Sequence, residues 1–177
     1  GGLDVHGVVT GFAPIPLVTD NMSKALKGSG IVIILLPAYA HKSIAHEMAP
    51  YLEADQLVLL MPGQTGGALE FARILTSHMR MADIILGEAQ TFSFISRTLS
   101  RSAVLISKIK DCVNVSAFPA SSNRRLLKLL ENLPLCFKLS SNVMETGLGN
   151  VNAMLHPTPT LLSAGLLESR KGGYKHY

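Results

Sequence analysis

The sequence predicts an α/β protein built on a parallel sheet, and three observations point to this fold class. Two apolar runs, 31–36 and 57–61, lack polar alternation and have the length and β-branched composition of strands buried on both faces. Between them, a segment from about His41 places Ile44 and Met48 on one helical face. A strand, a helix and a strand joined by short links form a βαβ unit, whose strands run parallel.

The composition agrees with a packed domain of this kind. The chain has 177 residues, of which 47% are hydrophobic and 16% charged, against about 25% charged in an average soluble domain. Such a length accommodates about one to one and a half ordinary domains, and it excludes a large multidomain enzyme.

The remaining elements follow in order along the chain. Residues 3–19 alternate short apolar stretches with Gly and Pro, which predicts a hairpin-like excursion. Thr19, Asp20 and Asn21 offer N-cap oxygens to a short helix that ends before Gly28. Further on we expect a helix over 68–77, strands at 84–86, 103–106 and 113–118, and an amphipathic helix around Leu126 to Leu133.

The pattern changes at Ser140. From there the chain is rich in Asn, Gly, Met and Leu at helical spacing, and no strand signal follows. We therefore expect a domain boundary near residue 140, with 1–139 forming part of an α/β domain and 140–177 beginning an all-helical one.

Charge and apolar runs argue against two partner classes. The net charge is +4, but the 16 Lys and Arg residues are scattered and lack interleaved aromatic residues, which disfavours a nucleic-acid surface. The longest apolar run, 31–40, is broken by Pro37 and is far shorter than the ~20 residues of a membrane span. Without a secretion signal at the first residues, we expect a cytoplasmic protein, cut at both ends.

The cysteines and histidines give no metal signal. Cys112 and Cys136 lie in apolar, strand-like segments without CxxC spacing, and His41 and His46 lack a ligand spacing. We expect two buried thiols in a reducing compartment and no metal site.

Two strand ends are candidates for cofactor contacts. Pro37 and Ala38 follow the first buried strand, and Pro62 and Gly63 follow the second. Ligands of open α/β sheets bind outside the carboxyl ends of strands, where small residues let a flat nucleotide approach. The alternative is that these residues only form the turns that every parallel strand needs.

The Gly-rich turn that follows is a candidate anion site. Gln64, Thr65 and two glycines open a helix, whose free N–H groups and dipole favour a carboxylate. The alternative is a plain N-cap by Thr65, with Gln64 facing solvent.

Residues 141–157 form the segment with the densest set of candidate functional residues. Asn150, Gly147 and Gly149 accompany a His156–Pro157 pair on a helical apolar pattern. Each glycine costs a helix about 1 kcal/mol relative to alanine, so another group approaches this backbone or the helix tolerates the loss. By itself, His156 is more typical of a structural or exposed histidine than of a catalytic one.

The order of these segments resembles the opine dehydrogenase family, which includes octopine and nopaline dehydrogenases. The resemblance covers nearly the whole chain, and its last two segments are the most specific. It is carried by residues 17–20, 32–38 with His41, 62–71, 87–91 (Gly-Glu-Ala-Gln-Thr) and 142–157.

The resemblance implies an enzyme that uses NAD or NADP to condense an amino acid's amine reductively with a 2-oxo acid such as pyruvate. His156, before Pro157, matches the family's catalytic histidine, and an imidazole with a pKa of about 6.5 can serve as acid and base near neutrality. Gln64 and Thr91 match oxo-acid contacts, and Asn150 lies on nearly the same helix face as His156. The sequence leaves open whether the protein acts as a homodimer.

Two parts of the family's pattern are absent from this sequence. The family opens with a strand and a GxGxxG fingerprint, and it closes with a long helical domain that supplies an acidic partner for the histidine. The resemblance thus implies an incomplete Rossmann-type sheet that lacks its first βα unit, followed by the first helix or helices of an all-α domain. We expect such a fragment to bind cofactor poorly and to catalyse little.

Two other interpretations stay open. A ketopantoate reductase-like or glycerol-3-phosphate dehydrogenase-like enzyme would share the sheet, but it would use a lysine where this chain has His156. A noncatalytic nucleotide-binding module would keep the fold without the chemistry.

Overall fold

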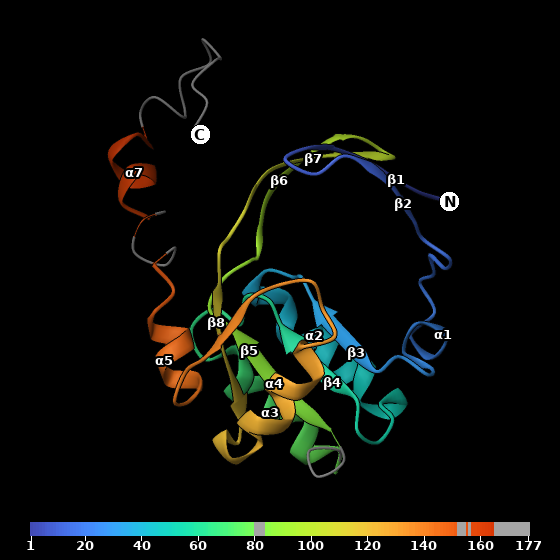
Figure 1. Ribbon diagram of the computed structural model, residues 1–177. Helices are drawn as coiled ribbons and strands as arrows, with labels where there is room; N and C mark the ends of the chain where they lie inside the picture. The colour runs from blue at the N-terminus through green and yellow to red at the C-terminus, as the bar shows by residue number, and fades with distance from the viewer. Residues whose placement is uncertain (80–83, 152–154, 156, 165–177) are drawn as a thin grey trace.

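A computed structural model describes residues 1–79, 84–151, 155 and 157–164 of the chain. The main body is a five-stranded sheet in the order β3-β4-β5-β8-β9, with helices on both faces (Figure 1). Its strands are β3 (Ile31–Ile34), β4 (Leu57–Leu60), β5 (Ile85–Ala89), β8 (Val113–Phe118) and β9 (Phe137–Leu139). β3, β4 and β5 run parallel, as the sequence predicts.

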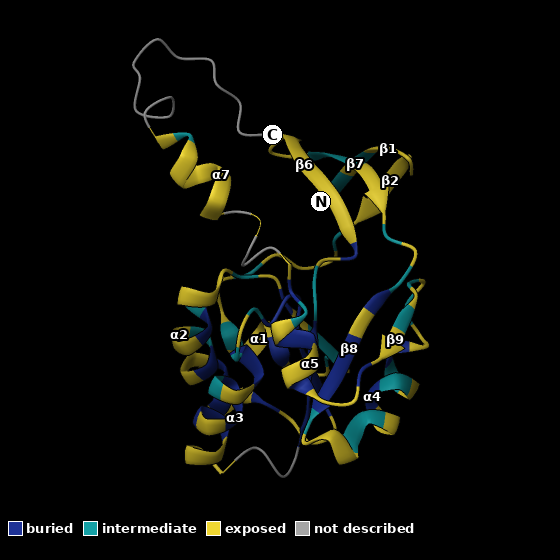
Figure 2. Ribbon diagram, turned by 90° about the vertical axis from the view of Figure 1, so that its left-hand side faces the viewer, coloured by how far each residue is buried: buried dark blue, intermediate teal, exposed yellow. Residues whose placement is uncertain are grey.

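Helices bury both faces of this sheet. One face packs against α1 (Met22–Leu26), α2 (Ala38–Met48) and α3 (Gly67–Ser77), and the other against α4 (Asn123–Leu130). Figure 2 shows α2 and α3 on one side of the sheet and α4 on the other. Every residue of β4 is buried, which accounts for a strand without polar alternation. Single 3₁₀ turns follow α2 at Ala49–Tyr51 and precede α4 at Ala120–Ser122.

A second, four-stranded sheet stands apart from this body (Figure 1). It joins the hairpin β1 (Gly2–Gly7) and β2 (Gly11–Pro14) to the hairpin β6 (Phe94–Ser100) and β7 (Ala103–Ile109), in the order β2-β1-β7-β6. The hairpin expected within 3–19 is thereby confirmed. The strand expected at 103–106 exists, but it lies in this second sheet.

The second hairpin also explains why the main sheet is mixed. Between β5 and β8 the chain forms β6 and β7 and no crossover helix, so β8 returns antiparallel to β5. Parallel neighbours require a crossover, whereas antiparallel ones do not. A wholly parallel sheet was therefore the wrong expectation at this one pairing, and β6 and β9 were not predicted.

The remaining helices are short. α5 (Val143–Leu148) packs Val143 into the core beside α3, and α7 (Pro157–Leu162) is exposed. Within the described residues, no helix is long and apolar enough to cross a membrane.

The cysteines differ from the expectation of two buried thiols. Cys112, just before β8, and Cys136, just before β9, form a disulfide. Cys112 is half-buried and Cys136 is exposed. Because β8 and β9 pair in parallel, with Val113 opposite Phe137, the residues that precede them are adjacent. Spacing along the sequence could not reveal this pairing.

Candidate functional site

The carboxyl ends of β3, β4 and β5 meet at one edge of the main sheet. Met61 N donates to Ile34 O at 3.0 Å, and Gly63 N donates to Ala89 O at 3.1 Å. These bonds align the turns that leave the three strands. The predicted site segments after these strands therefore share one edge, where ligands of open α/β sheets bind.

Glu88, at the end of β5, is the central side chain of this edge. It is 1% exposed. Its Oε2 accepts from the backbone N–H of Ala68 at 2.9 Å, and its Oε1 lies 2.9 Å from the hydroxyl of Thr146 on α5. Burial raises the pKa of Glu88, and the bonds to Ala68 and Thr146 oppose that rise in part.

Gln64 and Asn150 are brought together, although 86 residues separate them in the chain. The side-chain amide of Asn150 donates to Gln64 Oε1 at 3.4 Å. Gln90 contributes to the same contact region by donating to the carbonyl of Gly149. Gln64 has a φ of 58°, in the left-handed region that is uncommon for residues other than glycine. Such strain is frequent where a side chain is aimed at a ligand.

His41 lies behind this edge, on α2. It is buried, its Nε2 lies 3.1 Å from Leu36 O, and its ring packs edge-on against Phe71 with centroids 5.9 Å apart. Since a carbonyl only accepts, Nε2 carries the proton and Nδ1 is a buried acceptor without a partner among the described residues. Burial lowers the pKa of His41, against the raising effects of Leu36 and Glu70.

Thr91 directly follows Gln90 in the chain and is half-buried. Its Oγ1 accepts from Lys110 Nζ at 2.7 Å. Burial lowers the pKa of Lys110, and the nearby charge of Lys108 lowers it further. The arrangement places a partly desolvated ammonium group next to a predicted substrate residue.

The four predicted cofactor residues fall into two environments. Pro37 and Ala38, at the start of α2, are exposed and open to a ligand. Pro62 and Gly63 are buried. A Cβ on Gly63 would overlap the carboxyl group of Glu88, so glycine at this position makes room for a protein side chain. Of these two strand ends, only the end of β3 is therefore exposed.

His156, the predicted catalytic residue, lies outside the described residues. Among the residues that are described, no group of three or more His, Cys, Asp or Glu side chains could hold a metal ion.

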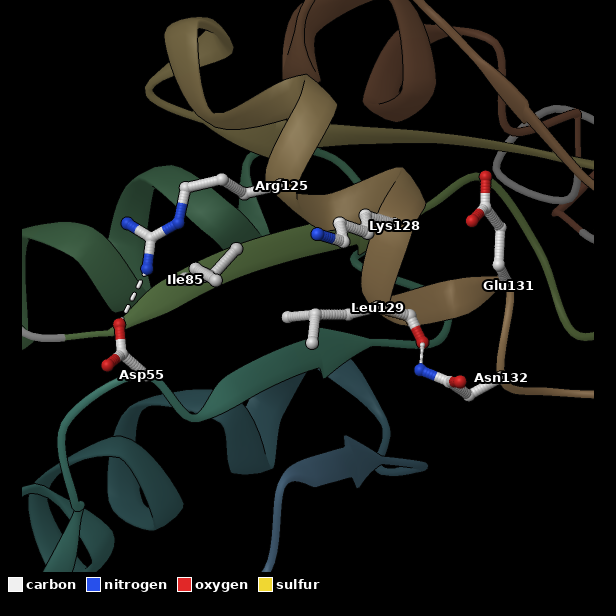
Figure 3. A pocket seen from close by; sticks show the side chains of 7 residues that line it. All are labelled: Asp55, Ile85, Arg125, Lys128, Leu129, Glu131 and Asn132. Atoms are coloured by element: carbon white, nitrogen blue, oxygen red, sulfur yellow. Dashed lines mark hydrogen bonds and ion pairs between the residues drawn. The ribbon is translucent and has the colours of Figure 1, made fainter.

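A surface pocket lies at the opposite edge of the sheet, beside the amino ends of β4 and β5 (Figure 3). Arg125 of α4 reaches Asp55 there at 2.6 Å, and these side chains are 59% and 81% exposed. Ile85 and Leu129 form its apolar part. None of the predicted site residues lines this pocket, and its ion pair is solvated, so it is not the candidate site.

Glu88, Thr146, His41 and Lys110 were not predicted as members of the site. The trace that they leave in the sequence is Gly63 and Gly147, which both stand where a Cβ would press on the Glu88 carboxyl group. Without coordinates, these glycines are indistinguishable from ordinary turn and helix-end residues.

No protein-family model matches the chain. In sequence, it is 35% identical over 161 residues to an opine dehydrogenase of Arthrobacter sp. (strain 1C), covering 91% of this chain and 45% of that protein. The chain thus spans less than half the length of this relative.

Solved structures with the same fold include octopine dehydrogenase with NADH and pyruvate (TM-score 0.75, 18% identity, 98% of this chain and 46% of that one). Yersinopine dehydrogenase with NADP+ is similar at a TM-score of 0.73, 15% identity, 96% of this chain and 44% of that one. A putative 2-dehydropantoate 2-reductase from Enterococcus faecalis reaches 0.63, with 16% identity over 92% of this chain and 51% of that one. These likenesses confirm the Rossmann-type α/β fold.

Proposed function

We propose that this chain, a homologue of the opine dehydrogenases, supplies the nucleotide-binding part and one wall of the substrate site in an NAD(P)-dependent opine dehydrogenase. The proposed reaction joins an amino acid's amine to the carbonyl carbon of a 2-oxo acid such as pyruvate. Water leaves, and the resulting C=N bond takes up a hydride and a proton to give a secondary amine. The 35% identity over 91% of the chain carries this proposal.

The cofactor would bind along the carboxyl edge, against the exposed Pro37 and Ala38, with Pro62 and Gly63 shaping the floor beneath it. The nicotinamide ring supplies the hydride, and the protein supplies binding and orientation. NAD and NADP both remain candidates, because the ribose-reading residue of this fold follows a GxGxxG turn that this sequence does not contain.

The substrates would bind above the same edge. Gln64, in the turn between β4 and α3, and Asn150, two residues after α5, present amide groups that can hydrogen-bond a carbonyl or carboxylate oxygen. Thr91 would contact the oxo acid, and Lys110 beside it offers a positive charge to the carboxylate. A positive charge beside Thr91 would serve to recognise the anionic substrate of the proposed reaction.

His156 is the proposed general acid and base, which donates a proton as the carbonyl oxygen leaves and accepts one in the reverse direction. We further propose that 1–139 forms the nucleotide-binding part and that 140–177 begins a helical domain. Asn150, which bonds to Gln64, would then lie at the junction of the two parts.

The proposal is tested on the full gene product that includes this sequence. Oxidation of NADH and NADPH is followed by absorbance with pyruvate and a panel of amino acids, and the product is identified by mass. Turnover that requires both substrates supports the proposal. Turnover with a 2-oxo acid alone would favour a ketopantoate reductase-like enzyme, and binding of cofactor without any turnover would favour a noncatalytic module.

His156→Ala provides the test of the acid and base. We expect turnover to fall by roughly 10² or more, with little change in cofactor affinity. Unchanged turnover would remove His156 from the mechanism.

A further inference from the structure

Glu88 connects three elements whose meeting forms the substrate wall. The residue belongs to β5, its Oε2 takes the N–H of Ala68 in the first turn of α3, and its Oε1 meets Thr146 of α5. Both Glu88 and Thr146 are 1% exposed. No ion pair involving Glu88 is found in the described part of the chain, so no opposite charge there compensates a buried negative charge, and only the two hydrogen bonds oppose the cost of burying it.

The single hydrogen of the Thr146 hydroxyl can point either to Glu88 or to the carbonyl of Val143. Thr146 Oγ1 is 2.9 Å from Glu88 Oε1 and 3.0 Å from the carbonyl oxygen of Val143. A hydroxyl has one hydrogen, and the Val143 carbonyl can only accept. If Thr146 donates to Val143, the proton between Thr146 and Glu88 must come from Glu88. A neutral acid protonated on Oε1 and accepting from Ala68 through Oε2 satisfies all these contacts at once.

Two glycines leave the space that the Glu88 carboxyl group occupies. Gly63 leaves space that a Cβ would take from the Glu88 carboxyl group. An ideal Cβ on Gly147 would come within 3.2 Å of Glu88 Oε1 and 3.2 Å of Gln64 O. The bare backbone of α5 therefore lies directly on Glu88 and on the turn that carries Gln64. Three residues after Gly147, Asn150 makes its bond to the Gln64 side chain.

We propose that Glu88 is a positioning residue which, as a neutral carboxylic acid, fastens α5 to the sheet edge and so holds Asn150 beside Gln64. The functional part of this inference rests on the proposed substrate role of Gln64 and Asn150. The protonation and the fastening do not, because they rest on the burial of Glu88 and on its contacts with Ala68 and Thr146. Glu88 differs from a substrate-binding carboxylate in that both of its oxygens are already occupied by protein groups.

The first test is the pH dependence of unfolding in the wild-type chain and in Glu88→Gln. A glutamine amide can donate to Thr146 and accept from Ala68, so it reproduces the neutral acid. A Glu whose folded pKa lies above its ordinary value of 4.5 stabilises the fold most below that pH, and this contribution is lost as pH rises. We expect equal urea midpoints at pH 5 and a higher midpoint for Glu88→Gln at pH 7 to 8.

The other charged groups on the adjoining elements are the same in the wild type and in Glu88→Gln, so their effects cancel in the difference between the two urea midpoints. They are Glu70 and Arg73 on α3 and Glu145 on α5, and β4 and β8 contain none. Glu145→Gln is the matched control. The pKa of exposed Glu145 is lowered by its bond from Ser141, so its replacement should lower the midpoint at neutral pH. A Glu88→Gln midpoint below wild type, or a difference independent of pH, would overturn the neutral acid.

The second test separates fastening from general stability. Thr146→Val removes the hydroxyl and Thr146→Ser retains it. We expect amide exchange of 143–148 to accelerate about tenfold or more in Thr146→Val, with β4 amides unchanged, and Thr146→Ser to match the wild type. In the full gene product, Thr146→Val should raise the KM for the oxo acid while leaving cofactor affinity intact.

The outcomes distinguish the two proposals. If the gene product turns over no substrate pair, the pH profile and amide exchange still decide the role of Glu88. If it is active and Thr146→Val leaves both KM and α5 exchange unchanged, α5 is not held through Glu88. If Glu88→Gln is stable but loses substrate binding, Glu88 acts as a charged ligand and the positioning role is wrong.

Discussion

The two sheets of this molecule have opposite environments. β4 in the main sheet is buried at every position, whereas β6 in the second sheet is exposed at every position. Figure 2 shows this contrast as a buried body below an exposed four-stranded sheet. The main sheet has helices on both faces, and no described helix covers the second sheet. Apolar β-branched residues therefore predict a strand, but only the neighbouring elements decide whether that strand contributes a core.

The largest expected difference follows directly from this contrast. Leu59 is 0% exposed in β4, and Leu99 is 56% exposed in β6. Leu59→Ala should lower the free energy of unfolding by about 3 kcal/mol, because it leaves a cavity in a packed interior. Leu99→Ala should change it by no more than about 0.5 kcal/mol. Urea unfolding measures both, and equal effects would show that the second sheet is also buried in solution.

Gly63→Ala tests how tightly the functional edge of the main sheet is filled. Its added Cβ would overlap the Glu88 carboxyl group, and we expect a loss of about 2 kcal/mol in stability. Gly30→Ala is the control, since a Cβ there meets nothing within 4 Å. Thermal or urea unfolding of the two variants should differ clearly. If Gly63→Ala left the stability unchanged, the Glu88 side chain could move out of its site without cost.

Lys110→Met tests the point where the two sheets meet. Lys110 follows β7 and donates to Thr91 beside the main sheet. If its charge binds the oxo-acid carboxylate, its loss should raise the KM for that substrate about tenfold, which corresponds to about 1.4 kcal/mol. Lys108→Met, on the exposed part of β7, is the control. Steady-state kinetics on the full gene product would refute this role if both variants behaved alike.

Arg125→Ala gives the smallest expected effect. The Arg125–Asp55 pair joins α4 to the turn before β4, and both side chains are largely exposed. Solvated pairs of this kind contribute about 0 to 1 kcal/mol, and salt screens them. We expect a change in unfolding free energy below about 0.5 kcal/mol that vanishes at high salt. A larger, salt-independent loss would indicate that the pocket of Figure 3 is structurally important.

The sequence was sufficient for the elements that depend on local pattern. The runs at 31–36 and 57–61, the helix between them and the N-cap by Asn21 all appear in the structure. These features are set by hydrophobic periodicity and by capping residues that lie close together in the chain.

The features that were missed depend on contacts between distant residues. The antiparallel β8, the Cys112–Cys136 disulfide and the burial of Glu88 each require knowing which segments become neighbours. The pairing of Gln64 with Asn150 was approached only through a family resemblance, because local pattern does not relate positions 86 residues apart.

The base of the β6–β7 hairpin has a consequence for how this fold can vary. Gln90 N donates to Asn114 O at 2.9 Å, and Lys110 N donates to Ser93 O at 2.9 Å. The hairpin thus leaves and re-enters the main body through a closed stem, and β5 and β8 pair directly beneath it. Such a stem makes the outer hairpin a module: it can be shortened, lengthened or exchanged without changing the strand order below. Recombination at this stem is a route to altering the rim of the site while the core stays constant.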